Sequence, residues 1–132
     1  MKRTRVGWVF GIFAILTISA CSQAPDARGF LEGEVTIGPL VPVVRPGETE
    51  PTPAPEVYEA RKIVVYEEDG KTEVLRIDIN ANGSYRAELP VGTYIVDINR
   101  IGVDSASNLP MTIDILEQQV TRLDIDIDTG IR

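Results

Sequence analysis

Residues 78–98 restrict the fold of this chain more than any other stretch. Two turn signals lie in it, Asn82-Gly83 and Pro90-Val91-Gly92, because Asn and Gly tolerate positive φ and Pro fixes φ. Apolar and polar residues alternate between and after these turns, with apolar side chains at Tyr85, Ala87, Leu89, Tyr94, Val96 and Ile98. This alternation is typical of half-buried strands, so residues 78–98 predict a β-meander of consecutive strands.

Further strands are predicted on both sides of this meander, because β-branched and apolar residues recur in short runs. These runs are residues 30–37, 57–66, 72–79, 110–116 and 120–128. In the first run, Gly33 is expected to mark a bulge or a close approach of another segment. After Cys21 no segment shows the apolar period of a helix, so helix should be nearly absent. About seven short strands at turn spacings of roughly 8 to 12 residues predict an all-β fold, a single antiparallel β-sandwich.

Two connections stand out between the predicted strands. Residues 39–55 are rich in proline, which excludes a helix and a central strand there. Two interpretations of this segment stay open: a rigid connection packed along the domain edge, or an exposed proline-rich segment that a partner binds. The connection from Arg100 to Leu109 is polar and is the candidate for a variable binding loop.

The N-terminus has the pattern of a secretory signal peptide. A basic start is followed by an apolar run over residues 6–20. The run is shorter than the roughly 20 apolar residues that a transmembrane helix needs, so we interpret residues 1–20 as a signal peptide rather than a retained span. The sequence therefore predicts an extracytoplasmic protein.

The end of this segment, Ile18-Ser19-Ala20-Cys21, resembles the lipobox of bacterial lipoproteins. The resemblance implies that Cys21 receives lipid, with acyl chains such as palmitate, and becomes the new N-terminus. The alternative is an ordinary secretory signal followed by a stray cysteine. Residues 21–29 are then a tether, residues 30–132 the folded domain, and the membrane is a partner through Cys21. Ser22 implies the outer membrane or cell surface, with the periplasmic side as the other location.

The net charge and the absence of histidine exclude several classes of function. The formal net charge is −7; without Lys2, Arg3 and Arg5 the basic count falls from 13 to 10 against 20 acidic residues, which gives −10. Such a surface repels phosphate backbones, so no nucleic acid is expected as a partner. The chain has no histidine, the commonest general base and metal ligand. We therefore predict no enzyme activity, no catalytic residues and no cofactor.

One group of residues has the spacing of a calcium loop. Asp78, Asn80, Asn82 and Gly83 match the opening of an EF-hand, but its twelfth position, which should be a bidentate Glu, is Leu89. An Asn-Gly turn explains the same residues more simply. Asp78, Asn80 and Asn82 are candidates for a metal site in the alternative function, a calcium-dependent adhesion or binding module.

Two further acidic patterns lie near the C-terminus. Asp124, Asp126 and Asp128 alternate with apolar residues, which predicts one solvated strand face that also blocks edge pairing, with cation binding as the alternative. Asp128-Thr129-Gly130 copies the catalytic tripeptide of aspartic proteases, but only Ile131 and Arg132 follow it in place of the supporting loop. A hydrolase is therefore the least favoured alternative.

Two stretches together resemble a known domain family. Asn82-Gly83-Ser84-Tyr85 and Leu89-Pro90-Val91-Gly92-Thr93-Tyr94 are similar to the signature of carboxypeptidase regulatory-like domains. The resemblance implies a transthyretin-like branch of the Ig-like β-sandwiches and an accessory or structural role without catalytic residues. We therefore expect a lipid-anchored lipoprotein that presents a non-catalytic binding or structural module.

Overall fold

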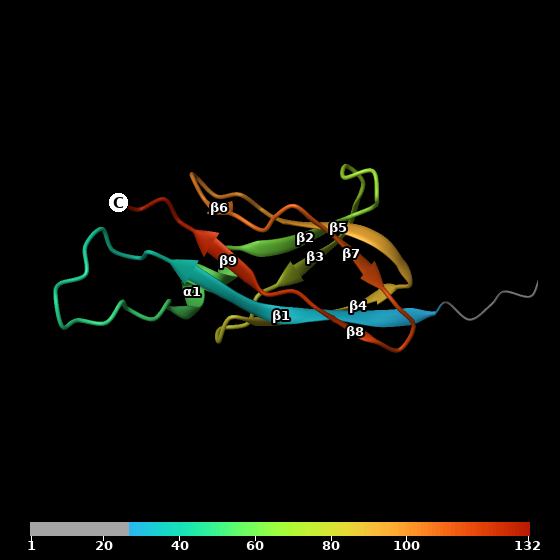
Figure 1. Cartoon of the computed structure of the whole chain (residues 1–132), viewed down its shortest axis with the longest axis horizontal. Coiled ribbons are helices and arrows are strands. Elements are labelled where there is room, and N and C mark those ends of the chain that lie inside the picture. Colours follow the sequence, from blue (N-terminus) through green and yellow to red (C-terminus); the bar gives the residue numbers. More distant parts are fainter. Residues whose placement is uncertain (1–26) are drawn as a thin grey trace, which may run out of the picture.

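In this computed structural model, the structure describes residues 27–132. The predicted signal peptide and Cys21 lie outside them. Within the described residues the chain forms nine strands and one short helix. The predicted all-β class is confirmed, and two sheets pack face to face as a β-sandwich (Figure 1).

Two sheets divide the strands. The five-stranded sheet contains β1 (Arg28–Gly38), β4 (Ser84–Pro90), β6 (Ser105–Ala106), β8 (Val120–Arg122) and β9 (Ile125–Asp128). The four-stranded sheet has the order β3 (Glu73–Asp78), β2 (Lys62–Tyr66), β5 (Gly92–Ile98) and β7 (Met111–Ile115). Most neighbours are antiparallel, and β1 adds parallel pairings to β8 and β9.

The meander predicted for residues 78–98 is wrong about strand pairing. Its strands and turns form as expected, but β4 pairs with β1 whereas β5 pairs with β2 and β7. The turns at Gly83 and at Pro90–Gly92 therefore cross from one sheet to the other. Alternation reveals which face of a strand is buried, but not which strand lies beside it.

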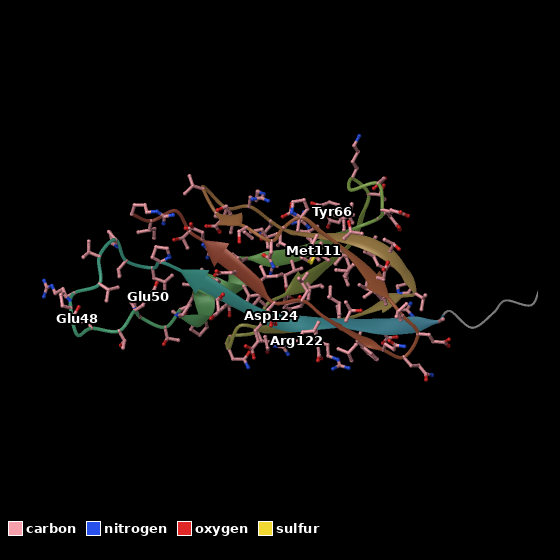
Figure 2. The ribbon with its side chains drawn as sticks, viewed as in Figure 1. Glu48, Glu50, Tyr66, Met111, Arg122 and Asp124 are labelled. Carbon is pink, nitrogen blue, oxygen red and sulfur yellow. The ribbon has the colours of Figure 1, made fainter. Side chains whose placement is uncertain are left out.

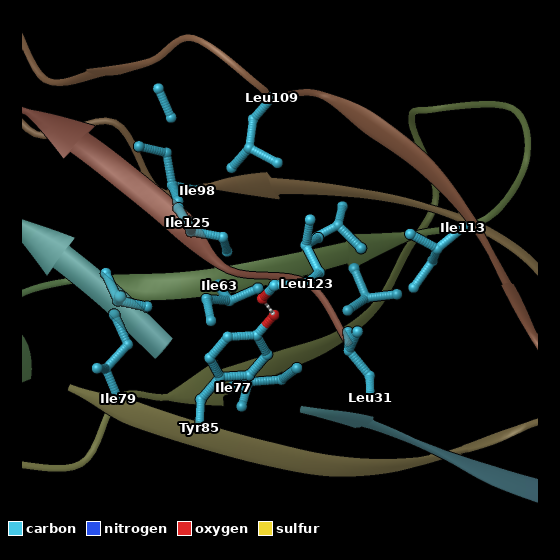
Figure 3. Close-up of a cluster of buried hydrophobic side chains, with 14 of the residues drawn as sticks. Leu31, Ile63, Ile77, Ile79, Tyr85, Ile98, Leu109, Ile113, Leu123 and Ile125 are labelled. Atoms are coloured by element: carbon cyan, nitrogen blue, oxygen red, sulfur yellow. Dashed lines mark hydrogen bonds between the residues drawn. The ribbon is translucent and has the colours of Figure 1, made fainter. Parts of the chain in front are cut away.

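The core lies between the two sheets and is made of side chains that alternate along each strand. Leu31, Ile63, Tyr85 and Ile125 are almost completely buried there (Figure 3). The predicted strand 57–66 is partly wrong, because helix α1 (Pro55–Glu59) occupies its first part. Proline is favoured in the first helical turn, and the buried Tyr58 packs this helix against the core.

The last predicted strand, residues 120–128, divides into β8 and β9. Leu123 and Asp124 lie between them, and the two short strands pair with successive parts of β1. Arg28 and Gly29, which we assigned to the tether, belong to β1. Among residues 27–132, no helix is long and apolar enough to cross a bilayer.

Candidate functional site

The two ends of the sandwich differ in what they present. β1 begins at one end, here called the proximal end, and its 11 residues span about 35 Å. The opposite end gathers residues 39–54, 99–104 and 129–132, which we call the distal end (Figure 1). This end contains the binding loop and the proline-rich segment proposed from the sequence.

The proline-rich segment projects from the sandwich as a loop with a closed base. Residues 42–52 are exposed, so the interpretation of a connection packed along the domain edge is wrong for them. At the base, the Leu40 amide donates a hydrogen bond to a Glu50 carboxylate oxygen at 3.2 Å. Figure 2 shows Glu48 near the tip and Glu50 nearer the sandwich.

The tip of this loop is a turn that our sequence analysis missed. The Glu48 amide donates to the Arg45 carbonyl at 2.9 Å, and Gly47 has a φ of 88°. Pro46 and Gly47 occupy the two central positions, which is the signal of a type II turn. The Pro-Gly pair could have identified it. Beside the turn, Val43 is 78% exposed.

A shallow groove of about 300 Å³ lies where the loop returns to β1. Thr36 and Ile37 of β1 form one side, Glu50–Pro53 the other, and Tyr58 of α1 lines it as well. The groove adds a concave surface to the otherwise projecting distal end.

The predicted binding loop, Arg100–Leu109, is only partly free. Asp104 is buried and accepts two hydrogen bonds from Arg61, at 2.8 and 3.2 Å. Farther along, Ala106 lies in β6 and Leu109 is buried. The longest exposed stretch is residues 100–103, in which Val103 is 74% exposed.

The aspartic-protease-like tripeptide fixes the C-terminal segment to β1. The Thr129 hydroxyl donates to the Pro39 carbonyl at 2.5 Å, and its amide donates to Gly38 at 3.0 Å. Asp128 accepts a hydrogen bond from Gly130 at 2.8 Å and pairs with Arg132 at 2.8 Å. The Arg132 side chain, and then the Gly130 amide, lower the pKa of Asp128. These contacts give the tripeptide a structural role.

The candidate calcium residues are occupied by other contacts. Asp78 pairs with Lys62 at 2.6 Å. The Asn82 side-chain oxygen accepts hydrogen bonds from the Ser84 amide and hydroxyl, at 3.1 and 2.7 Å, and Asn80 donates to the same hydroxyl at 3.0 Å. Within residues 27–132, the structure gathers no group of three or more carboxylate, histidine or cysteine ligands. The geometry is that of the Asn-Gly turn.

The alternating aspartates lie on a solvated face, as predicted, but not on an edge strand, because β9 lies between β1 and β6. Asp124 accepts a hydrogen bond from the Glu34 amide at 2.9 Å and pairs with Arg122 at 3.0 Å (Figure 2). The Glu34 amide lowers the pKa of Asp124, and Arg122 lowers it further. Asp126 accepts from the Thr36 hydroxyl at 3.0 Å. The carboxylates therefore join neighbouring strands.

No protein-family model matches the chain, and no curated protein matches it either. Among solved structures, it is similar to GBS52, the minor pilin of Streptococcus agalactiae, with a TM-score of 0.53 and 14% identity. The match covers 77% of this chain and 44% of that one. The likeness is one of fold. It confirms the β-sandwich, and the chain spans less than half the length of GBS52.

Two weaker matches also cover most of this chain. A DUF3823 family protein from Parabacteroides merdae has a TM-score of 0.48 and 16% identity, with 78% of this chain and 47% of that one covered. BcpA, the major pilin subunit of Bacillus cereus, has a TM-score of 0.46 and 16% identity, with 76% of this chain and 28% of that one covered.

Proposed function

We propose that this chain is a lipid-anchored, extracytoplasmic bacterial lipoprotein whose β-sandwich is a non-catalytic binding or structural module. The observation that carries the proposal is the short distance along the chain between Cys21 and the sandwich. Only residues 22–26 separate Cys21 from Ala27, whose carbonyl accepts a hydrogen bond from the Val91 amide at 2.8 Å. A chain of that length reaches at most about 20 Å, so an acylated Cys21 holds the proximal end near the membrane.

The distal end is the proposed binding surface, because a membrane-bound sandwich presents it farthest from the lipid. The length of β1 separates it from the anchored end. It combines a projecting turn at Arg45–Glu48, exposed Val43 and Val103, and the groove beside Tyr58. Loops positioned by a rigid sandwich are the usual place for such contacts.

We also propose that the domain belongs to the carboxypeptidase regulatory-like group, and the contacts of its tyrosines support this. The Tyr94 hydroxyl donates to the Pro90 carbonyl at 2.7 Å, and the Tyr85 hydroxyl donates to the Leu123 carbonyl. The Gly83 amide closes its turn on Asn80 at 2.8 Å. The residues that carry the resemblance therefore close the two turns between the sheets, through Tyr94 and Gly83, and tie Tyr85 of β4 to the segment between β8 and β9, which fits an accessory module.

Substitution of the anchoring cysteine tests the proposed location. We expect Cys21→Ala to move the protein from the membrane to the soluble fraction, whereas Ser22→Ala should leave it membrane-bound. Mass spectrometry of the wild-type protein should find Cys21 acylated and at the N-terminus. Membrane retention of Cys21→Ala would show a signal anchor that spans the membrane instead.

Site-specific crosslinking tests the proposed binding surface. A photoreactive amino acid is placed at Val43 or Val103, and at Val74 on β3 as the control, because Val74 is an exposed valine outside the distal end. We expect one discrete crosslinked product on intact cells from the two distal positions only. Equal products from all three positions would contradict a distal binding surface.

A further inference from the structure

The proximal end carries apolar side chains that the sandwich does not cover. Val91 is 43% exposed, Leu116 is 50% exposed and Val120 is 49% exposed. We call these three residues the proximal patch. They lie in or beside the turn between β4 and β5 and the turn between β7 and β8, at the end where β1 begins (Figure 1).

The three residues surround the point where the chain enters the sandwich. Gly92 pairs with Ile115, so Val91 and Leu116 are the next residues on two adjacent chain segments. Val120 pairs with Phe30 in the parallel register of β1 and β8. The entry point itself is held from both sides, because Val91 donates to Ala27 and Gln118 donates to Arg28, each at 2.8 Å.

We propose that the proximal patch rests on the lipid bilayer that anchors the chain; this inference rests on the proposed acylation of Cys21. Residues 22–26 keep Ala27, which bonds to Val91 of the patch, within about 20 Å of the acylated residue. At that distance the apolar side chains reach the boundary between the lipid headgroups and the acyl chains. Their transfer out of water into this boundary is favourable. The sandwich then stands on its proximal end with the distal end away from the lipid.

The charges around the patch indicate which lipid surface it fits. Arg28 pairs with Glu88 at 3.7 Å, which neutralises the basic group nearest the entry point. Glu117 is exposed in the turn beside Leu116. Because the whole chain is acidic, anionic headgroups repel it. The patch therefore matches a neutral, zwitterionic headgroup layer.

The single cysteine of the chain allows a direct test. In the acylated protein the Cys21 thiol is consumed, so a cysteine introduced elsewhere is the only free thiol. The full-length gene is expressed in a bacterium that processes lipoboxes, and the mature protein is reconstituted into phosphatidylcholine vesicles. Leu116→Cys and Val120→Cys carry a fluorophore on the patch, and Val103→Cys carries it at the distal end.

Nitroxide-labelled lipids then report which labels contact the bilayer. We expect at least about twofold stronger quenching at positions 116 and 120 than at 103. Equal quenching at all three positions, with acylation confirmed by mass spectrometry, would overturn the docking but leave the lipoprotein proposal intact. An unacylated Cys21 would instead overturn the lipoprotein proposal and the inference that rests on it.

Two double variants distinguish a loss of membrane docking from damage to the fold. Val91→Ser with Leu116→Ser should reduce quenching of the label at 120 to the level seen at 103. Val43→Ser with Val44→Ser, an exposed apolar pair at the distal end, should leave the quenching at 120 unchanged. Both proteins should retain the wild-type melting temperature. Unchanged quenching in the patch variant would contradict the proposal.

Discussion

At the centre of β1, a missing side chain makes room for a crossing segment. A Cβ atom at Gly33 would lie 1.9 Å from the Leu123 carbonyl oxygen. That carbonyl accepts a hydrogen bond from Tyr85, which lies opposite Gly33 on β4 and is 2% exposed (Figure 3). Glycine and tyrosine together therefore fix the segment between β8 and β9 against β1.

Gly33→Ala should destabilise the fold through this contact. The new methyl group would overlap the Leu123 carbonyl oxygen. Because one is fixed to the β1 backbone and the other is a backbone atom, one of the two segments must shift. We expect the free energy of unfolding to fall by about 3 kcal/mol, measured by urea denaturation. Gly92→Ala is the matched control, because its Cβ would meet only ordinary contacts at 3.6 Å or more. Equal effects of the two variants would contradict this explanation.

Tyr85→Phe should change both the stability and its dependence on alkaline pH. Loss of the bond to Leu123 leaves a buried carbonyl unpaired, which lowers the free energy of unfolding by about 1–2 kcal/mol. Burial raises the pKa of the Tyr85 hydroxyl, and Asp124 raises it further. Above about pH 10 the unfolded state therefore binds fewer protons than the folded state, and wild-type stability decreases as pH rises.

Urea denaturation of wild type and Tyr85→Phe between pH 8 and pH 11 tests this effect of Tyr85 burial on stability. The stability difference between wild type and Tyr85→Phe should shrink as the pH rises above about 10. A difference for Tyr85→Phe that stays constant over this range would refute the role given to burial.

Sequence patterns predicted part of this arrangement. Gly33 was predicted as a bulge or a close approach, and the close approach is confirmed. Leu123 as the partner was not predictable, because a backbone carbonyl leaves no signal in side-chain chemistry. The same limit applies to Thr129, whose hydroxyl also binds a carbonyl distant in the sequence.

At the scale of elements, α1 shows how a strong apolar run misleads. Residues 57–66 were predicted as one strand because the run from Ile63 to Tyr66 has no polar gap, yet Pro55 begins a five-residue helix before β2. The helix is too short for its period to be recognised. Its position is fixed from outside, by burial of Tyr58 and by the ion pair that follows it.

That ion pair joins Arg61, just after α1, to the loop that contains β6. The side chains of Arg61 and Asp104 are only 13% and 4% exposed, and two hydrogen bonds connect them. Asp104→Ala leaves the arginine buried without a partner, so we expect a loss of about 3 kcal/mol in the free energy of unfolding. Asp78→Ala, which breaks the exposed pair with Lys62, should cost under about 1 kcal/mol.

Chemical denaturation of both variants provides the comparison. A double variant, Arg61→Met with Asp104→Leu, should recover most of the loss, because no unpaired charge remains. An Asp104→Ala protein as stable as Asp78→Ala would mean that the buried pair does not hold the loop.

At the scale of the whole molecule, the sequence predicted the fold class but not the pairing that closes the sandwich. Turn residues and alternation are local, and they were sufficient to place most strands. The parallel pairing of β1 with β9 joins residues that are far apart in the sequence, such as Val35 and Ile125. Because each strand alternates in the same way, nothing in the pattern selects that partner over another. For the same reason, the sequence did not predict that three separate segments meet at the distal end.

Carboxylates across the molecule should make the fold sensitive to acid. Hydrogen bonds from Glu34 and Arg132 lower the pKa values of Asp124 and Asp128, respectively. When a pKa is lower in the folded state, the unfolded state binds more protons as the pH falls, so stability is lost below about pH 4. Above that pH, protonation relieves repulsion within the acidic chain and opposes the loss.

The urea midpoint should therefore stay level or rise from pH 7 to pH 5 and fall steeply toward pH 2. Asp124→Asn keeps an oxygen for the Glu34 amide but removes the titration, so its midpoint should fall less between pH 4 and pH 2. Asp124, just before β9, accepts a hydrogen bond from Glu34 of β1. A wild-type midpoint that does not fall below pH 4 would therefore mean that such hydrogen bonds contribute little to closing the sandwich.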